Sequence, residues 1–135
     1  MRAAALLGCC LLAACATSQS GTAATLYQPP AGSNLVLEGP IEAAPGHHLV
    51  MGDLFATPGM AIPAHRHSGE EFLYVLSGST VLSRQGLPDL ELKPGQGVRI
   101  APGVVHRGVA GTEGLRAVSS WIVVNGQPLR TPVER

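Results

Sequence analysis

The chain has 135 residues, enough for one domain of ordinary size. Its 9 Lys and Arg residues balance 9 Asp and Glu residues, and no basic run carries interspersed aromatic residues, so the composition excludes a typical nucleic-acid binder. With 17 Gly and 11 Pro residues and no long segment of helical periodicity, we expect an all-β domain of short strands and tight turns.

Residues 1–14 have the pattern of a signal peptide. Arg2 precedes an apolar stretch, Ala3 to Ala14, that is too short to span a bilayer. Leu12-Ala13-Ala14-Cys15 resembles the lipobox of bacterial lipoproteins, which implies cleavage before Cys15 and lipidation of that cysteine. Two alternatives stay open: an ordinary secretory signal that contains cysteines, and a lipobox ending at Cys9, which has a shorter apolar run before it.

The lipid anchor predicts the location of the protein. Several acyl chains, at about 0.8 kcal/mol per buried CH₂, would hold it on a membrane permanently, and no other membrane attachment is expected. Because Ala16 rather than Asp follows Cys15, the resemblance implies the outer membrane of a Gram-negative cell and the periplasmic face of the envelope. A mature chain that begins at Cys15 has no second cysteine and therefore no intrachain disulfide.

Residues 15–33 are small, polar and Pro-containing, which is typical of a flexible tether. An alternative for Leu26 and Tyr27 is that they pack on the folded domain or on a partner subunit. Residues 34–135 are expected to form the folded domain, because strand-forming segments alternate there with Gly, Pro or Asp. The predicted strands are 35–38, 48–55, 72–76, 80–84, 90–92, 98–100, 104–109 and 115–124.

Three potential metal ligands lie close together in the sequence: His65, His67 and Glu71. Residues two apart on a strand face the same side, so a strand here would direct both imidazoles into one site. Residues 68–70 are predicted to form a turn, which would bring the carboxylate of Glu71 back beside the imidazoles. Glu70 is the alternative carboxylate, but strand alternation turns it away from a site that Glu71 faces.

A fourth potential ligand, His106, follows the turn-forming segment Ala101-Pro102-Gly103. Three imidazoles and one carboxylate suit a divalent transition metal (Fe, Mn, Ni, Cu or Zn) and leave open positions on an ion that prefers six ligands. No thiolate is available, because all three cysteines precede residue 16. The predicted metal ligands are His65, His67, Glu71 and His106.

These residues resemble the two motifs of the cupins. The first cupin motif, G-x5-H-x-H-x3-E-x6-G, is matched at each fixed position by Gly59, His65, His67, Glu71 and Gly78. In the second motif, G-x5-P-x-G-x2-H-x3-N, Gly103 and His106 match, whereas Ala101 and Ala110 replace Pro and Asn. The resemblance covers about residues 34–126 and implies a single-domain jelly-roll β-barrel that binds a metal and commonly dimerises.

The first motif also predicts which side chains face inward. If Glu71 faces the inside of the barrel, Leu73 and Val75 do so too. The apolar residues Phe72, Tyr74 and Leu76 then face outward, and either a second layer of strands or a partner subunit must cover them. Because cupins commonly dimerise through such surfaces, the resemblance implies a homodimer.

Other notable residues have less specific signals. Trp121 is expected to pack in the core or at the dimer face rather than to stack on a ligand. His47 and His48 resemble a second metal pair, but adjacent residues on a strand face opposite sides, so we expect surface or capping histidines. Arg99 is a candidate for binding an anionic substrate in the pocket, and Arg84 and Arg116 are alternatives to it.

Three functions remain open at this point. The first is a small-molecule metalloenzyme of the dioxygenase or isomerase type. Glu71 would then also be the proton acceptor, since no separate acid, base or nucleophile stands out. The second is a non-catalytic module that binds a metal or a small molecule. The third is a structural barrel without metal.

Overall fold

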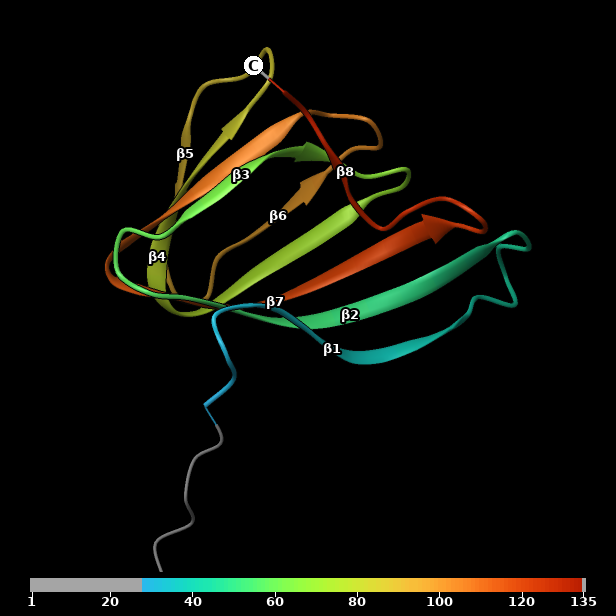
Figure 1. Ribbon diagram of the computed structural model, residues 1–135, viewed down its shortest axis with the longest axis horizontal. Coiled ribbons are helices and arrows are strands. Elements are labelled where there is room, and N and C mark those ends of the chain that lie inside the picture. Colours follow the sequence, from blue (N-terminus) through green and yellow to red (C-terminus); the bar gives the residue numbers. More distant parts are fainter. Residues whose placement is uncertain (1–27, 135) are drawn as a thin grey trace, which may run out of the picture.

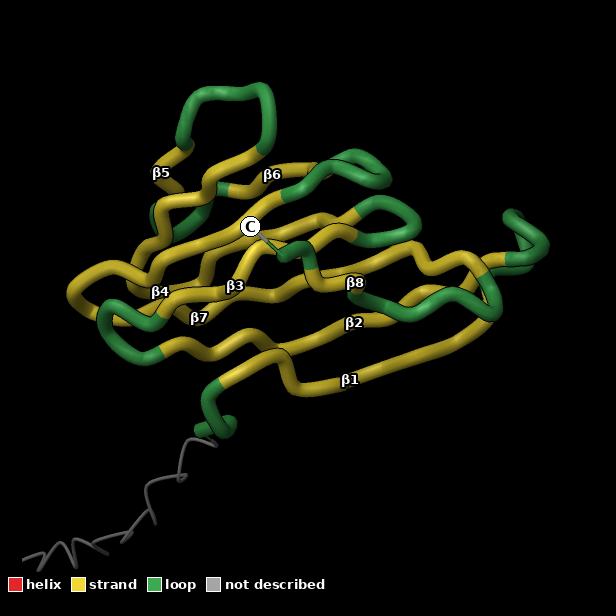
Figure 2. The backbone as a smooth tube through the Cα atoms, turned by 45° about the horizontal axis from the view of Figure 1, so that its top comes forward, coloured by secondary structure: helices red, strands yellow, loops and turns green. Residues whose placement is uncertain are grey.

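The computed structural model describes residues 28–134, and these form an all-β domain without helices (Figures 1 and 2). No helix in this part of the chain is therefore long or apolar enough to cross a membrane. The predicted signal peptide, Cys15 and most of the predicted tether lie outside the described residues. The strands are β1 (Gly32–Pro40), β2 (His47–Ala56), β3 (Ala61–Arg66), β4 (Glu71–Arg84), β5 (Leu90–Leu92), β6 (Gly97–Ile100), β7 (His106–Val124) and β8 (Thr131–Pro132).

Strand β7 organises the sheet, because it pairs antiparallel with β2, β3 and β4. Its first half lies beside β3 and the second half of β4, and its second half lies beside β2 and the first half of β4. Figure 1 shows the consequence: β1, β2 and the end of β7 form one layer, and β3 with the start of β7 forms the other. The sheet thus folds over itself into the predicted jelly-roll barrel.

The sequence prediction divided β4 and β7 into two strands each, and this was wrong. β4 continues through Gly78, with register shifts on both sides of it, and β7 continues through Gly114. Both glycines have positive φ, 68° and 78°, so they bend a strand where they were expected to end one. β8, which has two residues, was not predicted.

The inward and outward faces of β4 are as predicted. Glu71, Leu73 and Val75 are buried, and the three apolar residues between and after them are about half exposed: Phe72 43 %, Tyr74 49 % and Leu76 47 %. The main core fills the barrel with residues from five strands, including Leu54, Leu82 and Leu115. A second, smaller cluster joins Val50, Trp121 and Val123.

Candidate metal centre

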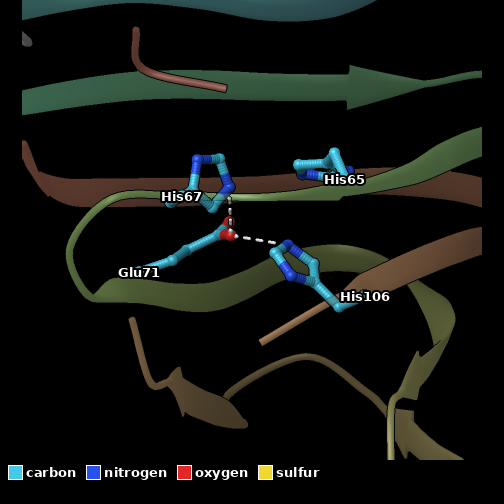
Figure 3. Close-up of side chains that lie close together, drawn as sticks. All are labelled: His65, His67, Glu71 and His106. Carbon is cyan, nitrogen blue, oxygen red and sulfur yellow. Dashed lines mark hydrogen bonds and ion pairs between the residues drawn. The ribbon is translucent and has the colours of Figure 1, made fainter. Parts of the chain in front are cut away.

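Three strand ends and one turn bring the predicted ligands together (Figure 3). His65 lies in β3 opposite His106, the first residue of β7. Glu71 begins β4, and His67 lies between the end of β3 and the turn that leads to β4. All four side chains are buried, and one potential ligand atom of each lies within 4.8 Å of the others. We call these four residues the His₃Glu cluster.

The turn at residues 68–70 is fixed against the end of β7. Ile122 donates its backbone N–H to the Glu70 carbonyl over 2.9 Å. A Cβ added at Gly69 would come within 1.7 Å of the Ile122 carbonyl oxygen, so a side chain does not fit there. This close approach holds His67 and Glu71, on either side of the turn, in place.

Hydrogen bonds set the tautomers of the three histidines. The Nδ1 atom of His65 lies 2.7 Å from the Pro63 carbonyl oxygen, that of His106 lies 2.9 Å from Val104 O, and that of His67 contacts Leu129 O. Because a carbonyl oxygen only accepts, each Nδ1 must carry the hydrogen. In the neutral form of each imidazole, Nε2 then keeps a lone pair, which is the usual state of a metal-binding histidine.

These lone pairs meet the carboxylate of Glu71. Its Oε2 lies 3.1 Å from Nε2 of both His67 and His106, and its Oε1 accepts a hydrogen bond from Ser119 Oγ over 3.1 Å. His67 Nε2 is within ion-pair distance of Glu71 Oε2. It is nevertheless buried and has no hydrogen-bond partner of suitable geometry among residues 28–134. An imidazole lone pair that faces a carboxylate repels it unless a proton or a metal cation lies between the two atoms, so this donor set fits a divalent metal ion.

The protonation states suit metal binding as well. Burial is the main cause that lowers the pKa of His65 to about 4; the hydrogen bond to Pro63 opposes this shift, and the electrostatic effects of His106, Arg130 and His67 add to it. Burial raises the pKa of Glu71, but His106 and His67 outweigh this and hold it well below its usual range. Near neutral pH His65 is therefore neutral and Glu71 is ionised, as ligation requires.

The His₃Glu cluster lies in a cavity of about 120 Å³. Its other walls are mainly apolar, with Leu54, Ile62 and Leu73 among them, and it reaches the surface at the exposed residues Ser33 and Arg130. Pockets for drug-sized ligands usually measure about 300–1,000 Å³. This cavity therefore suits a molecule of only a few non-hydrogen atoms.

Trp121 packs in the core, as predicted. It packs with Val50 and Val123, and its indole also lines the cavity, with its ring 5.8 Å from that of His67. His48 is a surface residue as predicted: its Nδ1 lies 2.8 Å from Asn125 Oδ1.

None of the three candidate arginines lines the cavity. Arg99 donates to Glu70 over 2.8 Å on the outside of the sheet, which also confirms that Glu70 points away from the cluster. Arg116 binds the carboxylate of Asp53 over 2.9 Å, and neither it nor Arg84 lines the cavity. The arginine that does line it is Arg130, which follows the motifs in a segment without strand periodicity and so gave no signal in the sequence.

Comparisons with known proteins agree with this geometry. Residues 54–123 match the family model described as "Cupin domain". Dimethylsulfoniopropionate lyase DddW of Ruegeria pomeroyi is 39 % identical over 75 residues, which cover 56 % of this chain and 48 % of that protein. The chain thus spans about half the length of the curated relative it matches.

Solved structures share the fold. A cupin-like protein from Thermotoga maritima superposes with a TM-score of 0.58 at 28 % identity, covering 63 % of this chain and 64 % of that one. A double-stranded β-helix protein from Klebsiella pneumoniae has a TM-score of 0.58 at 23 % identity, covering 82 % and 91 %. The lyase DddQ from Ruegeria pomeroyi has a TM-score of 0.55 at 20 % identity, covering 67 % and 44 %.

Proposed function

The chain belongs to the Cupin domain family, and from that premise we propose that it binds one divalent transition-metal ion in the His₃Glu cluster and acts through it on a small molecule. Fe, Mn, Ni, Cu and Zn all accept imidazole and carboxylate ligands. One observation carries the proposal: three histidine lone pairs and one carboxylate oxygen face a common buried point.

The proposed activity is that of a small-molecule metalloenzyme. When bound, the ion would supply Lewis acidity or, if redox-active, electron transfer, which suits dioxygenase-like or isomerase-like chemistry. The relative DddW is named as a lyase, which supports small-molecule turnover and adds elimination to the reaction classes to be tested. The apolar walls of the cavity would exclude water from the reacting molecule.

Glu71 is the proposed proton acceptor. Among the described residues that line the cavity, the hydroxyls of Ser119 and Thr80 already donate to Glu71 and to the Val109 carbonyl. The cavity holds no other carboxylate, and its three imidazoles belong to the cluster. The carboxylate of Glu71 is thus the available base closest to a bound molecule.

Metal content tests the first part of the proposal. We expect protein purified from its native host to hold one transition-metal ion per chain, and His106→Ala to lose it, because one of four ligands is gone. His48→Ala, which removes a surface imidazole, should keep the metal. Elemental analysis of the three proteins decides, and metal-free wild-type protein would refute the metal centre.

A non-catalytic metal or small-molecule binding module is the second candidate. The observation that favours it is the same scarcity of acid and base groups, since the described cavity offers none outside the His₃Glu cluster. The metal-loaded protein should be assayed for O₂ consumption and for conversion of carbonyl, phenolic and thiol compounds. Stoichiometric metal without turnover would favour the binding module.

We also propose that the protein is lipid-anchored at Cys15 on the periplasmic face of the bacterial envelope, with the outer membrane favoured. The lipobox-like segment Leu12-Ala13-Ala14-Cys15 supports this. Cys15→Ser should abolish detergent-requiring membrane attachment, whereas Cys9→Ser should leave it intact, because Cys9 ends the weaker lipobox. Fractionation of cells that express each variant measures the difference, and the opposite pattern would move the anchor to Cys9.

A further inference from the structure

Arg130 lies at the mouth of the cavity, beside a proposed metal ligand. Its Nη2 donates to the Pro63 carbonyl oxygen over 3.3 Å, and the same oxygen accepts the hydrogen bond from His65 Nδ1 over 2.7 Å. One carbonyl group therefore positions both the imidazole and the guanidinium. This places a permanent positive charge within reach of any molecule that enters the cavity.

The guanidinium has no carboxylate partner in the described part of the chain. All nine Asp and Glu side chains of the sequence fall within residues 28–134, and none of them pairs with Arg130. Arg99 and Arg116, by contrast, each have one. Because a guanidinium carries five N–H groups in a planar fork, Arg130 keeps donors for a ligand.

The charge balance of the cavity also favours an anion. Apart from the histidines, its charged lining residues are Glu71 and Arg130, and most of its other walls are apolar. With a divalent ion in the His₃Glu cluster, the positive charge of ion and guanidinium exceeds the single negative charge of Glu71. Because weakly polar walls screen charges less than water does, the attraction between this positive charge and an anionic molecule is stronger in the cavity than in solution.

We propose that the small molecule is a carboxylate of few non-hydrogen atoms, and that Arg130 binds its carboxylate group at the mouth of the cavity while the remainder lies against the metal centre. This rests on the proposed function, whose substrate class it names. The planar fork of arginine matches a carboxylate with two parallel hydrogen bonds. The small volume of the cavity sets the upper limit on size.

Ligand binding tests this without an activity assay. Trp121 is the only tryptophan of the chain and lines the cavity, so its fluorescence reports on a molecule that enters. Propionate and propionamide, which have the same shape but differ in charge, are titrated into the protein. We expect propionate to bind at least about tenfold more tightly, the effect of a charge-assisted hydrogen bond. Equal affinity for the two compounds would overturn the proposal.

Variants then assign the effect to Arg130. Arg130→Gln should raise the Kd of propionate about tenfold or more and leave that of propionamide unchanged. Arg130→Lys, which keeps the charge but not the fork, should have an intermediate effect and guards against misfolding of the first variant. The control is Arg66→Gln, which removes an exposed arginine of β3 outside the cavity and should change neither Kd. Unchanged propionate binding in both Arg130 variants would refute the assignment.

The class of anion and the dependence on metal are separate arms of the same experiment. Methylphosphonate, a tetrahedral anion of similar size, should bind more weakly than propionate, and tighter binding would reject the carboxylate. Metal content is measured in every sample. If the chain holds no metal but binds propionate through Arg130, the proposed function alone is refuted. If the chain holds stoichiometric metal but the Arg130 variants bind propionate like the wild type, this inference alone is refuted.

Discussion

Ser119 determines which oxygen of Glu71 is left for a metal. Its side chain is fully buried, and its hydroxyl donates to Oε1, so that Oε2 faces the histidines. Hydrogen-bond partners of metal ligands typically contribute 10- to 100-fold to metal affinity. We predict that Ser119→Ala weakens metal binding by about this factor, measured by competition with a chromophoric chelator. Ser120→Ala, on the opposite face of β7, should bind metal like the wild type, and equal affinity of both variants would contradict a positioning role.

His65 and Glu71 make the stability of the metal-free protein sensitive to acid in the same direction. The folded-state pKa of His65, about 4, lies below its ordinary value of 6.5, so between these values the unfolded chain takes up a proton that the native state does not. The free energy of unfolding should therefore fall as the pH is lowered through this window. The lowered pKa of Glu71 extends the fall below its ordinary value of 4.5.

Urea denaturation of chelator-treated protein at several pH values measures this prediction. Between pH 6.5 and 4, the free energy of unfolding should fall less in His65→Gln than in the wild type, because this variant lacks the imidazole concerned. Stability that is constant or rises as the pH falls through that window would show that His65 is not held neutral by its surroundings. Added metal should steepen the wild-type profile, since protons and the ion compete for the same nitrogen atoms.

At the scale of the strand, Gly78 lets β4 bend within the sheet. It has a φ of 68°, and a Cβ there would come within 2.1 Å of the Gly114 carbonyl oxygen. Gly86, in a turn, has a φ of 77° but open space around it. Gly86→Ala should lower the free energy of unfolding by about 1–2 kcal/mol, because alanine disfavours the left-handed conformation. Gly78→Ala should lower it by about 1–3 kcal/mol more, because its Cβ also meets the Gly114 carbonyl oxygen. Chemical denaturation compares the two, and equal losses would mean that the contact relaxes without cost.

The continuity of β4 and β7 could not be predicted from the sequence. Gly78 and Gly114 look like turn residues in a linear chain, and only pairing with strands far away in sequence keeps β4 and β7 extended through them. Alternation along residues 71–76 was predictable, because the period of two is a local property of a strand. β8 and Arg130 lie in a segment with no such pattern.

The candidate site was predictable where its residues are close in sequence or match a spaced motif. His65, His67 and Glu71 fall within a single turn and its flanks, and His106 stands at the position of a second motif. Ser119 was not predicted, because its contact with Glu71 depends on the register between β4 and β7. That register is set by packing of the whole barrel, which no local pattern expresses.

At the scale of the whole molecule, the exposed apolar face of β4 supports the proposed homodimer. Phe72, Tyr74 and Leu76 are each between 43 % and 49 % exposed, and they lie side by side on one strand. Single exposed apolar residues are common on soluble proteins, but a contiguous row of three large ones is typical of an interface. A second apolar stretch, residues 35–37, lies on β1 at the edge of the sheet.

One pair of substitutions decides between these surfaces. We predict that Tyr74→Glu converts the dimer to a monomer, because it buries a charge without a partner in the interface. Val36→Glu places the same charge on β1 and should leave the dimer intact. Sedimentation equilibrium of the lipid-free protein over a range of concentrations measures the mass of each. Dissociation by Val36→Glu alone would place the interface on β1, and a wild-type monomer at every concentration would exclude a dimer through either face.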